Sequence, residues 1–410
     1  MPLRNLPVDQ ITETDLNRLV VNGVMEGRRL DYKEQLKVDT GDDKNNFLAD
    51  IAAMANTLGG DILYGIEEQR DTNGKPTGIP QAVVGVDLPN WDPLRLQLQQ
   101  LIRDGIAPRI QGIELGIVPL ASGRSVIIIR IPPSIQAPHM ITRRSSPFYA
   151  RASGGNSPMD VDEIRQAFLR TANLIERADT FRRTRSQAVS SDSGPILVGS
   201  GAKTFLHIIP FTAQPFALDF SDGQVNAVVR DLPPLMPSNG VDTRLNFDGR
   251  VNVIPPDKDG EPSPSYVQVF RDGMIEYVDT HLAQRRSING HMRPVFYSPD
   301  FETTLVNGLK KGLQLLHSLT IPLPILVFLT LTNVQGYVFA EGYQDAALYS
   351  GKPGRRVIDR ADLYPAGQII DRPDQEVEQV LKPIFDTVAN ASGLVRSPAY
   401  DDNGQWKVTS

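Results

Sequence analysis

The sequence predicts an α+β protein, with a mixed-sheet domain in its N-terminal part and a second α+β domain after it. Three observations support this class. Short apolar runs typical of strands alternate with stretches of helical periodicity over the first 170 residues. A polar, serine-rich stretch at residues 186–193 then interrupts the pattern, and strand and helix patterns resume after residue 195. A chain of 410 residues is long enough for two or three domains.

The first domain is predicted from apolar periodicity alone. Thr12 or Thr14 is the expected N-cap of its first helix, Asp160 that of its last, and Gly59 ends the second. The expected helices span 10–25, 44–58, 91–106 and 161–171, and the expected strands lie near 30–33, 62–66, 83–86, 113–118, 126–131 and 147–152.

The second domain is predicted in the same way. A charged helix over 173–185 is expected to leave the first domain, and residues 186–193 form the expected linker. The pattern predicts strands near 205–209, 267–276 and 325–331, helices at 301–319 and 375–391, an irregular excursion at 231–265 and a frayed tail beyond Ser397. The expected divisions are therefore 1–172, 173–194 and 195–410. The apolar helix at 301–319 packs internally by default, and contact with a partner or a second copy stays open.

Composition limits the classes of function. The formal net charge is −6, so a nucleic-acid partner needs a local basic patch. The absence of cysteine excludes disulfides, zinc–thiolate sites and cysteine nucleophiles, and fits a reducing cytoplasm. The N-terminus lacks the apolar core of a signal peptide. The longest apolar run, 321–331, holds two prolines and is far shorter than the roughly 20 residues that span a bilayer. We expect a soluble cytoplasmic protein.

The most informative stretch carries acidic residues at both of its ends. Glu26 precedes a strand-like segment that holds Asp31 and Lys33. Glu67 and Glu68 directly follow a buried strand. If the two strands are neighbours in a sheet, these carboxylates meet at one edge. Hard oxygen ligands gathered in this way are typical of a divalent-metal site. The alternative is a set of solvated acids at strand ends, with Lys33 paired to Asp31 on the surface.

The same stretch resembles the Schlafen-type AlbA_2 domain. The resemblance covers roughly residues 10–170, and two of its acidic positions, Asp31 and Glu68, depart from the family's usual choices. It rests on Glu26, Asp31-Tyr-Lys33, the helix end Ala55-Asn-Thr-Leu-Gly-Gly60, the strand Gly65-Ile66 and Pro147-Phe-Tyr-Ala-Arg151.

The resemblance implies a metal-dependent endoribonuclease that cuts structured RNA such as tRNA, in a setting such as bacterial or antiviral defence. Glu26, Asp31 and either Glu67 or, preferably, Glu68 would hold Mg²⁺ or Mn²⁺. Lys33 would stabilise the charge that grows on the phosphate, which completes the catalytic set. Two other classes stay open: a non-catalytic nucleic-acid-binding or transcription-regulatory protein, and an ATP- or nucleotide-binding sensor that contacts phosphate through the Gly59-Gly60 turn.

Basic residues of the first domain predict a nucleic-acid groove, because cations bind phosphate and aromatic rings stack on bases. The alternative is a pair of mixed-charge loops with buried aromatics. His139 is expected in the core or at the surface rather than in the site. The predicted nucleic-acid-binding residues are Arg28, Arg29, Lys37, Arg143, Arg144 and Arg151, interleaved with Tyr32, Phe148 and Tyr149.

Overall fold

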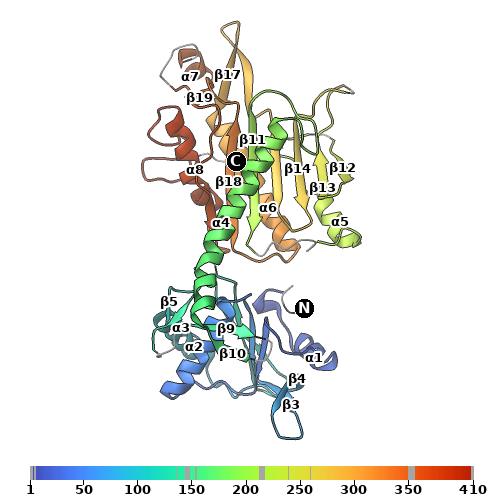
Figure 1. Ribbon diagram of the computed structural model, residues 1–410, viewed down its shortest axis with the longest axis vertical. Helices are drawn as coiled ribbons and strands as arrows, with labels where there is room; N and C mark the ends of the chain where they lie inside the picture. The colour runs from blue at the N-terminus through green and yellow to red at the C-terminus, as the bar shows by residue number, and fades with distance from the viewer. Residues whose placement is uncertain are drawn as a thin grey trace. The chain divides into compact units, whose positions relative to one another are not determined.

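The chain forms two compact units, residues 1–174 and 175–410, which are described separately below (Figure 1). The computed structural model describes residues 3, 6–134, 136–143, 148–152, 155–211, 218–238, 240–258, 260–349 and 356–407. No helix in this described part combines the length and the apolar character that crossing a bilayer requires.

The first unit is built on a mixed sheet, as predicted. Its strands run in the order β1 (Leu30–Lys33), β2 (Gly60–Tyr64), β7 (Ser125–Ile131) and β6 (Glu114–Pro119). The first pair is parallel and the other two pairs are antiparallel. Its other elements are η2 (Val8–Gln10), α1 (Glu13–Val21), α2 (Gly41–Ala55) and α3 (Trp91–Gly105), with the paired strands β3 (Ile66–Arg70) and β4 (Pro76–Val83), β5 (Ile106–Ala107) and β8 (Met140–Ile141), and β9 (Tyr149–Ala152) and β10 (Gly155–Pro158).

Side-chain alternation along the strands gives this sheet two apolar faces. One face packs against the α2 core, in which Leu48, Ile51 and Ile62 are fully buried. The opposite face packs against α1 through Leu16 and Tyr32. In β1, therefore, Tyr32 faces the α1 core, and its neighbours on either side, Asp31 and Lys33, face α2.

The helix α4 (Val161–Ser190) corrects the predicted linker at 186–193. Asp160 begins the helix as predicted, since its carboxylate accepts the Glu163 backbone N–H at 2.8 Å. The helix then continues to Ser190. Ser186 and Val189 are buried, because this end of α4 packs in the second unit. Tertiary packing here outweighs the weak helix preference of a serine-rich segment.

The second unit is centred on a larger sheet in the order β12-β13-β14-β15-β11-β18-β20. Its strands are β11 (Lys203–Pro210), β12 (Asp242–Leu245), β13 (Gly249–Val253), β14 (Ser265–Phe270), β15 (Ile275–Asp279), β18 (Ile325–Thr332) and β20 (Gln368–Ile370). A smaller sheet joins β16 (Ala283–Ile288), β17 (His291–Tyr297) and β19 (Val338–Ala340), and the helices are α5 (Gly223–Arg230), α6 (Ser298–Ser318), α7 (Tyr343–Tyr349) and α8 (Val377–Ala391). The predicted helices and the predicted strands near 205–209 and 325–331 are present, and the stretch predicted at 267–276 falls on two strands, β14 and β15, which pair antiparallel across a turn at 271–274. The predicted irregular stretch at 231–265 is wrong in part, because it contains the hairpin of β12 and β13.

The two faces of the larger sheet differ in chemistry. One face carries the main apolar core, where Leu206 and Tyr277 pack against α6 and α8. The other face holds a buried polar cluster centred on Glu276, which has no exposed surface. This carboxylate accepts hydrogen bonds from Arg185 of α4 at 2.7 and 3.0 Å and from Tyr266 at 3.0 Å, and it lies 3.0 Å from His207 Nε2.

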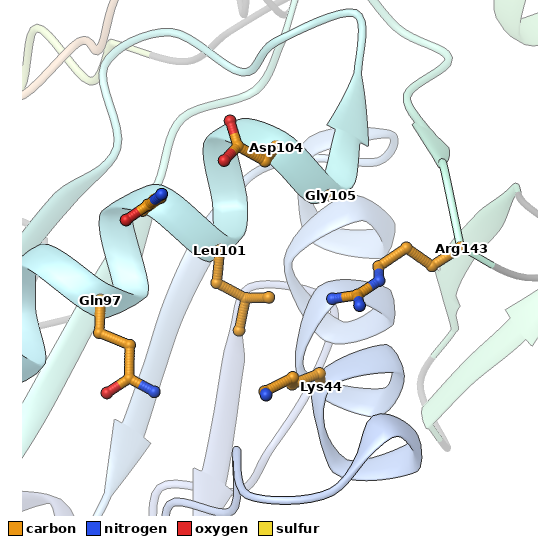
Figure 2. Close-up of a pocket in the computed structure, with 7 residues that line it drawn as sticks. Lys44, Gln97, Leu101, Asp104, Gly105 and Arg143 are labelled. Carbon is orange, nitrogen blue, oxygen red and sulfur yellow. The ribbon is translucent and has the colours of Figure 1, made fainter.

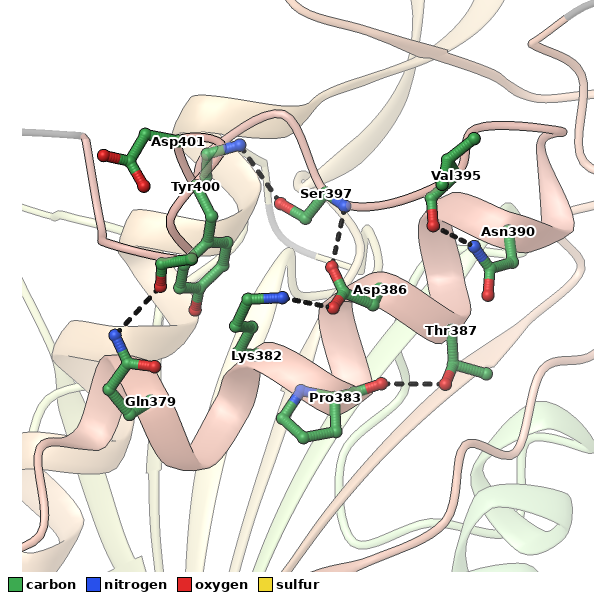
Figure 3. Close-up of polar contacts among 12 residues, drawn as sticks. Gln379, Lys382, Pro383, Asp386, Thr387, Asn390, Val395, Ser397, Tyr400 and Asp401 are labelled. Carbon is green, nitrogen blue, oxygen red and sulfur yellow. Dashed lines mark hydrogen bonds and ion pairs between the residues drawn. The ribbon is translucent and has the colours of Figure 1, made fainter.

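Residues 398–407 are held in place, so the frayed tail expected beyond Ser397 is wrong over this described range; residues 408–410 lie outside the described residues. Ser397 and Tyr400 are buried. Figure 3 shows individual polar bonds that fix the segment to α8: the Ser397 N–H donates to Asp386 at 2.9 Å, and Gln379 donates to the Gly404 carbonyl at 3.1 Å. Ser397 also donates to the fully buried carboxyl of Glu302 in α6, at 2.8 Å from each oxygen.

Candidate functional site

Asp31 is the centre of the acidic cluster in the first unit. Its side chain leaves β1 toward α2 and is 1% exposed. Arg151 Nη2 lies 2.7 Å from one carboxylate oxygen, and Lys33 Nζ lies 2.9 Å from the other. Burial alone would raise the pKa of Asp31, but the two cations outweigh burial and lower it. Asp31 is therefore the charged member of the cluster.

Glu26 meets Asp31 from the turn before β1. Its backbone N–H donates to the Gly78 carbonyl at 2.7 Å, and its carboxylate accepts the Tyr32 N–H. The Glu26 carboxyl also hydrogen-bonds to that of Asp31. Burial, followed by the charge of Asp31, raises the pKa of Glu26 to about 8. A divalent cation could bind two carboxyl groups placed in this way and replace the proton that Glu26 retains.

Glu68 interacts with this pair. Glu68 accepts the Gly78 N–H at 2.9 Å, beside the point where Gly78 holds Glu26, and its charge contributes to raising the pKa of Glu26. The pairing register of β3 shifts between Glu67 and Glu68. Among the described residues, Glu67 has no bond to the other acids, and its role as a fellow ligand stays a prediction.

Asp50 of α2 is a further acid that the sequence analysis missed. It lies 3.9 Å from Lys33 Nζ and accepts a hydrogen bond from Asn156 Nδ2. Burial raises the pKa of Asp50 to about 6, although Lys33 opposes the shift. Burial lowers the pKa of Lys33, but Asp50 and Asp31 outweigh this effect and raise it. Lys33 is thus a protonated cation among acids, and its side chain remains 36% exposed.

Arg151 holds the cluster together from inside. It is 5% exposed, and besides Asp31 its guanidinium reaches the carbonyls of Gly27 and Leu30, each at 3.4 Å. Arg151 therefore positions Asp31 from the interior of the unit, and its predicted contact with nucleic acid stays a prediction.

The predicted stacking aromatics also have other roles. Tyr32 is 1% exposed and donates its hydroxyl to the Val24 carbonyl at 2.7 Å, and Tyr149 is buried. His139 is fully buried, as expected of a core residue. Its backbone N–H donates to Asn56 Oδ1 at 2.6 Å, and Asn56 Nδ2 in turn donates to the carbonyls of His139 and Tyr149. Asn56, at the C-terminal end of α2, thus connects the segments of His139 and Tyr149 to this helix by hydrogen bonds.

The Gly59-Gly60 turn packs closely against neighbouring backbone. A Cβ atom at Gly59 would lie 2.5 Å from the Ile131 carbonyl oxygen, and one at Gly60 would lie 2.5 Å from the Arg29 carbonyl oxygen. Gly59 also has a φ of +61°, which glycine adopts without strain. These glycines serve close backbone packing, and the phosphate contact considered for a nucleotide sensor stays a prediction.

Exposed cations surround the unit without acidic partners. Arg28 and Lys37 are exposed and Arg29 is half-buried, and none of them forms an ion pair with a described residue. Arg143 is exposed, and Arg144 lies outside the described residues.

Arg143 and Lys44 line a cavity of about 410 Å³ between α2 and α3. In Figure 2 both cationic side chains point toward Leu101 of α3. The two side chains have no ion-pair partner in the described part of the chain. Sequence reasoning missed Lys44 because it occurs in a polar stretch far in sequence from Arg143. The lining also includes the amides of Gln97 and Gln100 and the carboxylate of Asp104. Two cations and amide donors beside Leu101 could bind a phosphate and the sugar or base next to it, and Asp104 opposes the phosphate charge.

The acidic cluster differs from a ready-made metal site. Across the described residues, no group of three or more His, Cys, Asp or Glu side chains has the arrangement that holds a metal ion. Arg151 and Lys33 lie 2.7 and 2.9 Å from the two oxygens of Asp31, and burial together with the charge of Asp31 raises the pKa of Glu26 to about 8. The donors are nevertheless the hard oxygens that Mg²⁺ and Mn²⁺ prefer.

These features define an α+β domain with buried, mutually perturbed acids at one side of its sheet. Residues 26–160 match the family model described as Schlafen, AlbA_2. The N-terminal unit therefore contains an AlbA_2 domain, as the motifs predicted, and this family indicates a nucleic-acid-related function.

The structural comparison adds one relative. The N-terminal domain of a RecG-related protein from Nitrosomonas europaea is 19% identical, with a TM-score of 0.25, and the match covers 35% of this chain and 88% of that one. No curated protein matches the chain.

Proposed function

We propose that the AlbA_2 domain is a divalent-metal-dependent endoribonuclease acting on structured RNA such as tRNA, in a defence setting. The observation that supports this proposal most is the meeting of Glu26, Asp31 and Glu68 beside Lys33, although they come from separate parts of the chain. Perturbed acids around a half-exposed cation are typical of catalytic sites.

In this proposal Glu26, Asp31 and Glu68 hold Mg²⁺ or Mn²⁺. The ion would supply a more acidic water and neutralise charge on the phosphate. Lys33 stabilises the negative charge that grows on the phosphate oxygens. Asp50, with a pKa of about 6, accepts a proton at neutral pH. Lys44 and Arg143 bind a neighbouring phosphate of the same RNA strand.

The strand β3 offers a matched pair of variants to test this site. We expect Glu68→Gln and Glu26→Gln to slow Mn²⁺-dependent cleavage of tRNA by about 100-fold or more, because each replaces a carboxyl group that can bind the ion as a carboxylate with a neutral amide. Glu67→Gln changes the next side chain along the strand, so its rate should stay within about twofold of the wild type. Equal rates for the Glu67 and Glu68 variants would contradict the proposal.

Metal binding has a readout that does not depend on cleavage. An ion that binds only the folded protein raises its melting temperature. We expect Mn²⁺ to raise the melting temperature of the wild type and of Glu67→Gln, and to have no effect on Glu26→Gln. A shift that persists in the Glu26 variant would place the ion elsewhere.

A second candidate is a non-catalytic nucleic-acid-binding or regulatory protein. It is favoured by the ion pairs that Lys33 and Arg151 make with Asp31, since they neutralise the acid without any metal. This candidate predicts RNA or DNA binding that weakens steeply with salt and is unchanged by EDTA. Cleavage that EDTA abolishes would exclude it.

A further inference from the structure

The outer edge of the larger sheet in the second unit carries an unpaired strand, β12. It pairs with β13 on one side, and no described strand pairs with it on the other (Figure 1). All four residues of β12 are exposed, as are Val241 before it and Phe247 after it, the latter to 88%. Natural edge strands are usually protected by short length, charged side chains, proline, bulges or a covering loop. β12 is short and carries one acid and one base, Asp242 and Arg244, so its charges oppose a like-charged strand and favour one with the complementary charge order.

The hydrogen-bond pattern shows which backbone groups of β12 point outward. Asn246 donates its N–H to the Gly249 carbonyl at 2.9 Å, which closes the hairpin. In an antiparallel pair, residues alternate between bonding the partner strand and pointing away from it. Counting back from Asn246, Arg244 and Asp242 bond β13. The N–H and C=O groups of Val241, Thr243 and Leu245 therefore point to the free edge.

The sequence of this edge is complementary to itself. When two copies run antiparallel about a twofold axis at Thr243, the outward groups of that residue face each other, and those of Val241 face those of Leu245. The same register places Asp242 directly opposite Arg244 of the other copy, twice. Opposite charges and apolar pairs across strands stabilise a sheet, and like charges destabilise it.

The two faces of such a pair have distinct chemistry. Val241, Thr243 and Leu245 share one face, and Asp242 and Arg244 share the other. Arg244 already donates to the Pro195 carbonyl at 2.6 Å, but a guanidinium has five N–H donors, so several remain for a carboxylate. The outward backbone groups, the apolar pairs and the charge pairs thus all favour the same twofold axis at Thr243.

We propose that β12 pairs with β12 of a second copy of this chain, antiparallel and centred on Thr243, and joins two larger sheets into one. This surface belongs to the second unit and is separate from the acidic cluster.

Charge exchange at the two edge positions tests the proposal. Asp242→Arg places arginine opposite arginine in a self-pair, and Arg244→Asp places aspartate opposite aspartate. In sedimentation velocity over about 1–100 μM, we expect the wild type to reach twice the chain mass of 45.2 kDa, and each single variant to remain at one chain mass.

Mixing the two single variants provides the decisive control. The pair of an Asp242→Arg chain with an Arg244→Asp chain is complementary again, so the equimolar mixture and the double variant D242R/R244D should both recover the dimer. Melting temperatures should be equal for all variants at low concentration. A monomeric wild type, dimeric single variants, or a mixture that stays monomeric would each overturn the proposal.

Discussion

Each unit buries a carboxylate beside an arginine on one face of a sheet, but the groups that surround the two carboxylates differ. Glu276 is fully enclosed and receives Arg185, His207 and Tyr266. Burial would raise the pKa of Glu276, yet the bonds from His207 and Arg185 outweigh it and lower this pKa to about 2. Around Asp31, in contrast, further acids compete for the same two cations.

This comparison separates a structural acid from a candidate functional one. The Glu276 carboxylate contacts polar groups of three side chains, Arg185, His207 and Tyr266. None of its described contacts is with another carboxylate. Burial, followed by the charge of Asp31, raises the pKa of Glu26 to about 8, and burial raises the pKa of Asp50 to about 6 although Lys33 opposes it. Unbalanced charge costs stability and is useful only where a ligand or a reaction can relieve it.

The largest effect should come from removing the structural acid. Glu276→Ala leaves the buried His207 and Tyr266 and the largely enclosed Arg185, whose side chain is 17% exposed, without their shared acceptor, so we expect the free energy of unfolding to fall by about 3 kcal/mol. Urea denaturation measures this change. Glu261→Ala removes an exposed acid of the same unit and should cost less than about 0.5 kcal/mol. A small loss in the Glu276 variant would show that its cluster is not the structural one.

Glu302 sharpens the comparison because it is buried with hydroxyl donors and no cation. Burial raises its pKa to about 8, so between roughly pH 4.5 and 8 the folded state keeps a proton that the unfolded chain releases. Stability therefore falls as the pH rises through this window, by about 1.4 kcal/mol per pH unit. Glu302→Gln stays neutral, so its melting temperature should match the wild type near pH 5 and exceed it at pH 8. Parallel curves for the two proteins would contradict this assignment.

Glu26→Gln should separate function from stability. Glutamine can keep the bond from the Tyr32 N–H and donate to Asp31, as the protonated acid does. We expect the free energy of unfolding at pH 7 to change by less than about 0.5 kcal/mol, while metal-dependent cleavage is lost. Urea denaturation and the tRNA assay measure the two outcomes. A large loss of stability would make the Glu26–Asp31 pair structural, like Glu276.

The smallest effect should come from the cations of the cavity. Lys44→Ala and Arg143→Ala each remove one phosphate contact, so the slope of log K against log salt should become shallower by about 1 for each. Fluorescence anisotropy with labelled RNA measures the slope. Lys258→Ala, an exposed lysine of the second unit, should leave it unchanged. Unchanged slopes for both cavity variants would place the RNA elsewhere.

The sequence predicted the helices and strands because their apolar residues recur at regular spacing. The AlbA_2 motifs indicated Glu26, Asp31, Lys33 and Glu68 of the acidic cluster. Asp50 was missed because it lies inside the apolar run of α2, and only packing across β1 brings it to Lys33. The segment after Ser397 was missed because isolated side chains such as Tyr400, packed in the core, and single hydrogen bonds hold it, and these leave no periodic signal. The buried state of Arg151 was equally invisible, since a sequence does not distinguish an inward arginine from a surface one.

Gly60 has a consequence for the acidic cluster as a whole. The Cβ that it lacks would also lie 2.6 Å from Met54 Sδ of α2, so the end of α2 and the turn at Arg29 approach each other only because this position is empty. Asp50 belongs to that helix, and Glu26 precedes that turn. The spacing between acids on separate elements is therefore set by a residue without a side chain, and one added methyl group there would change the chemistry of the cluster without altering a single charge.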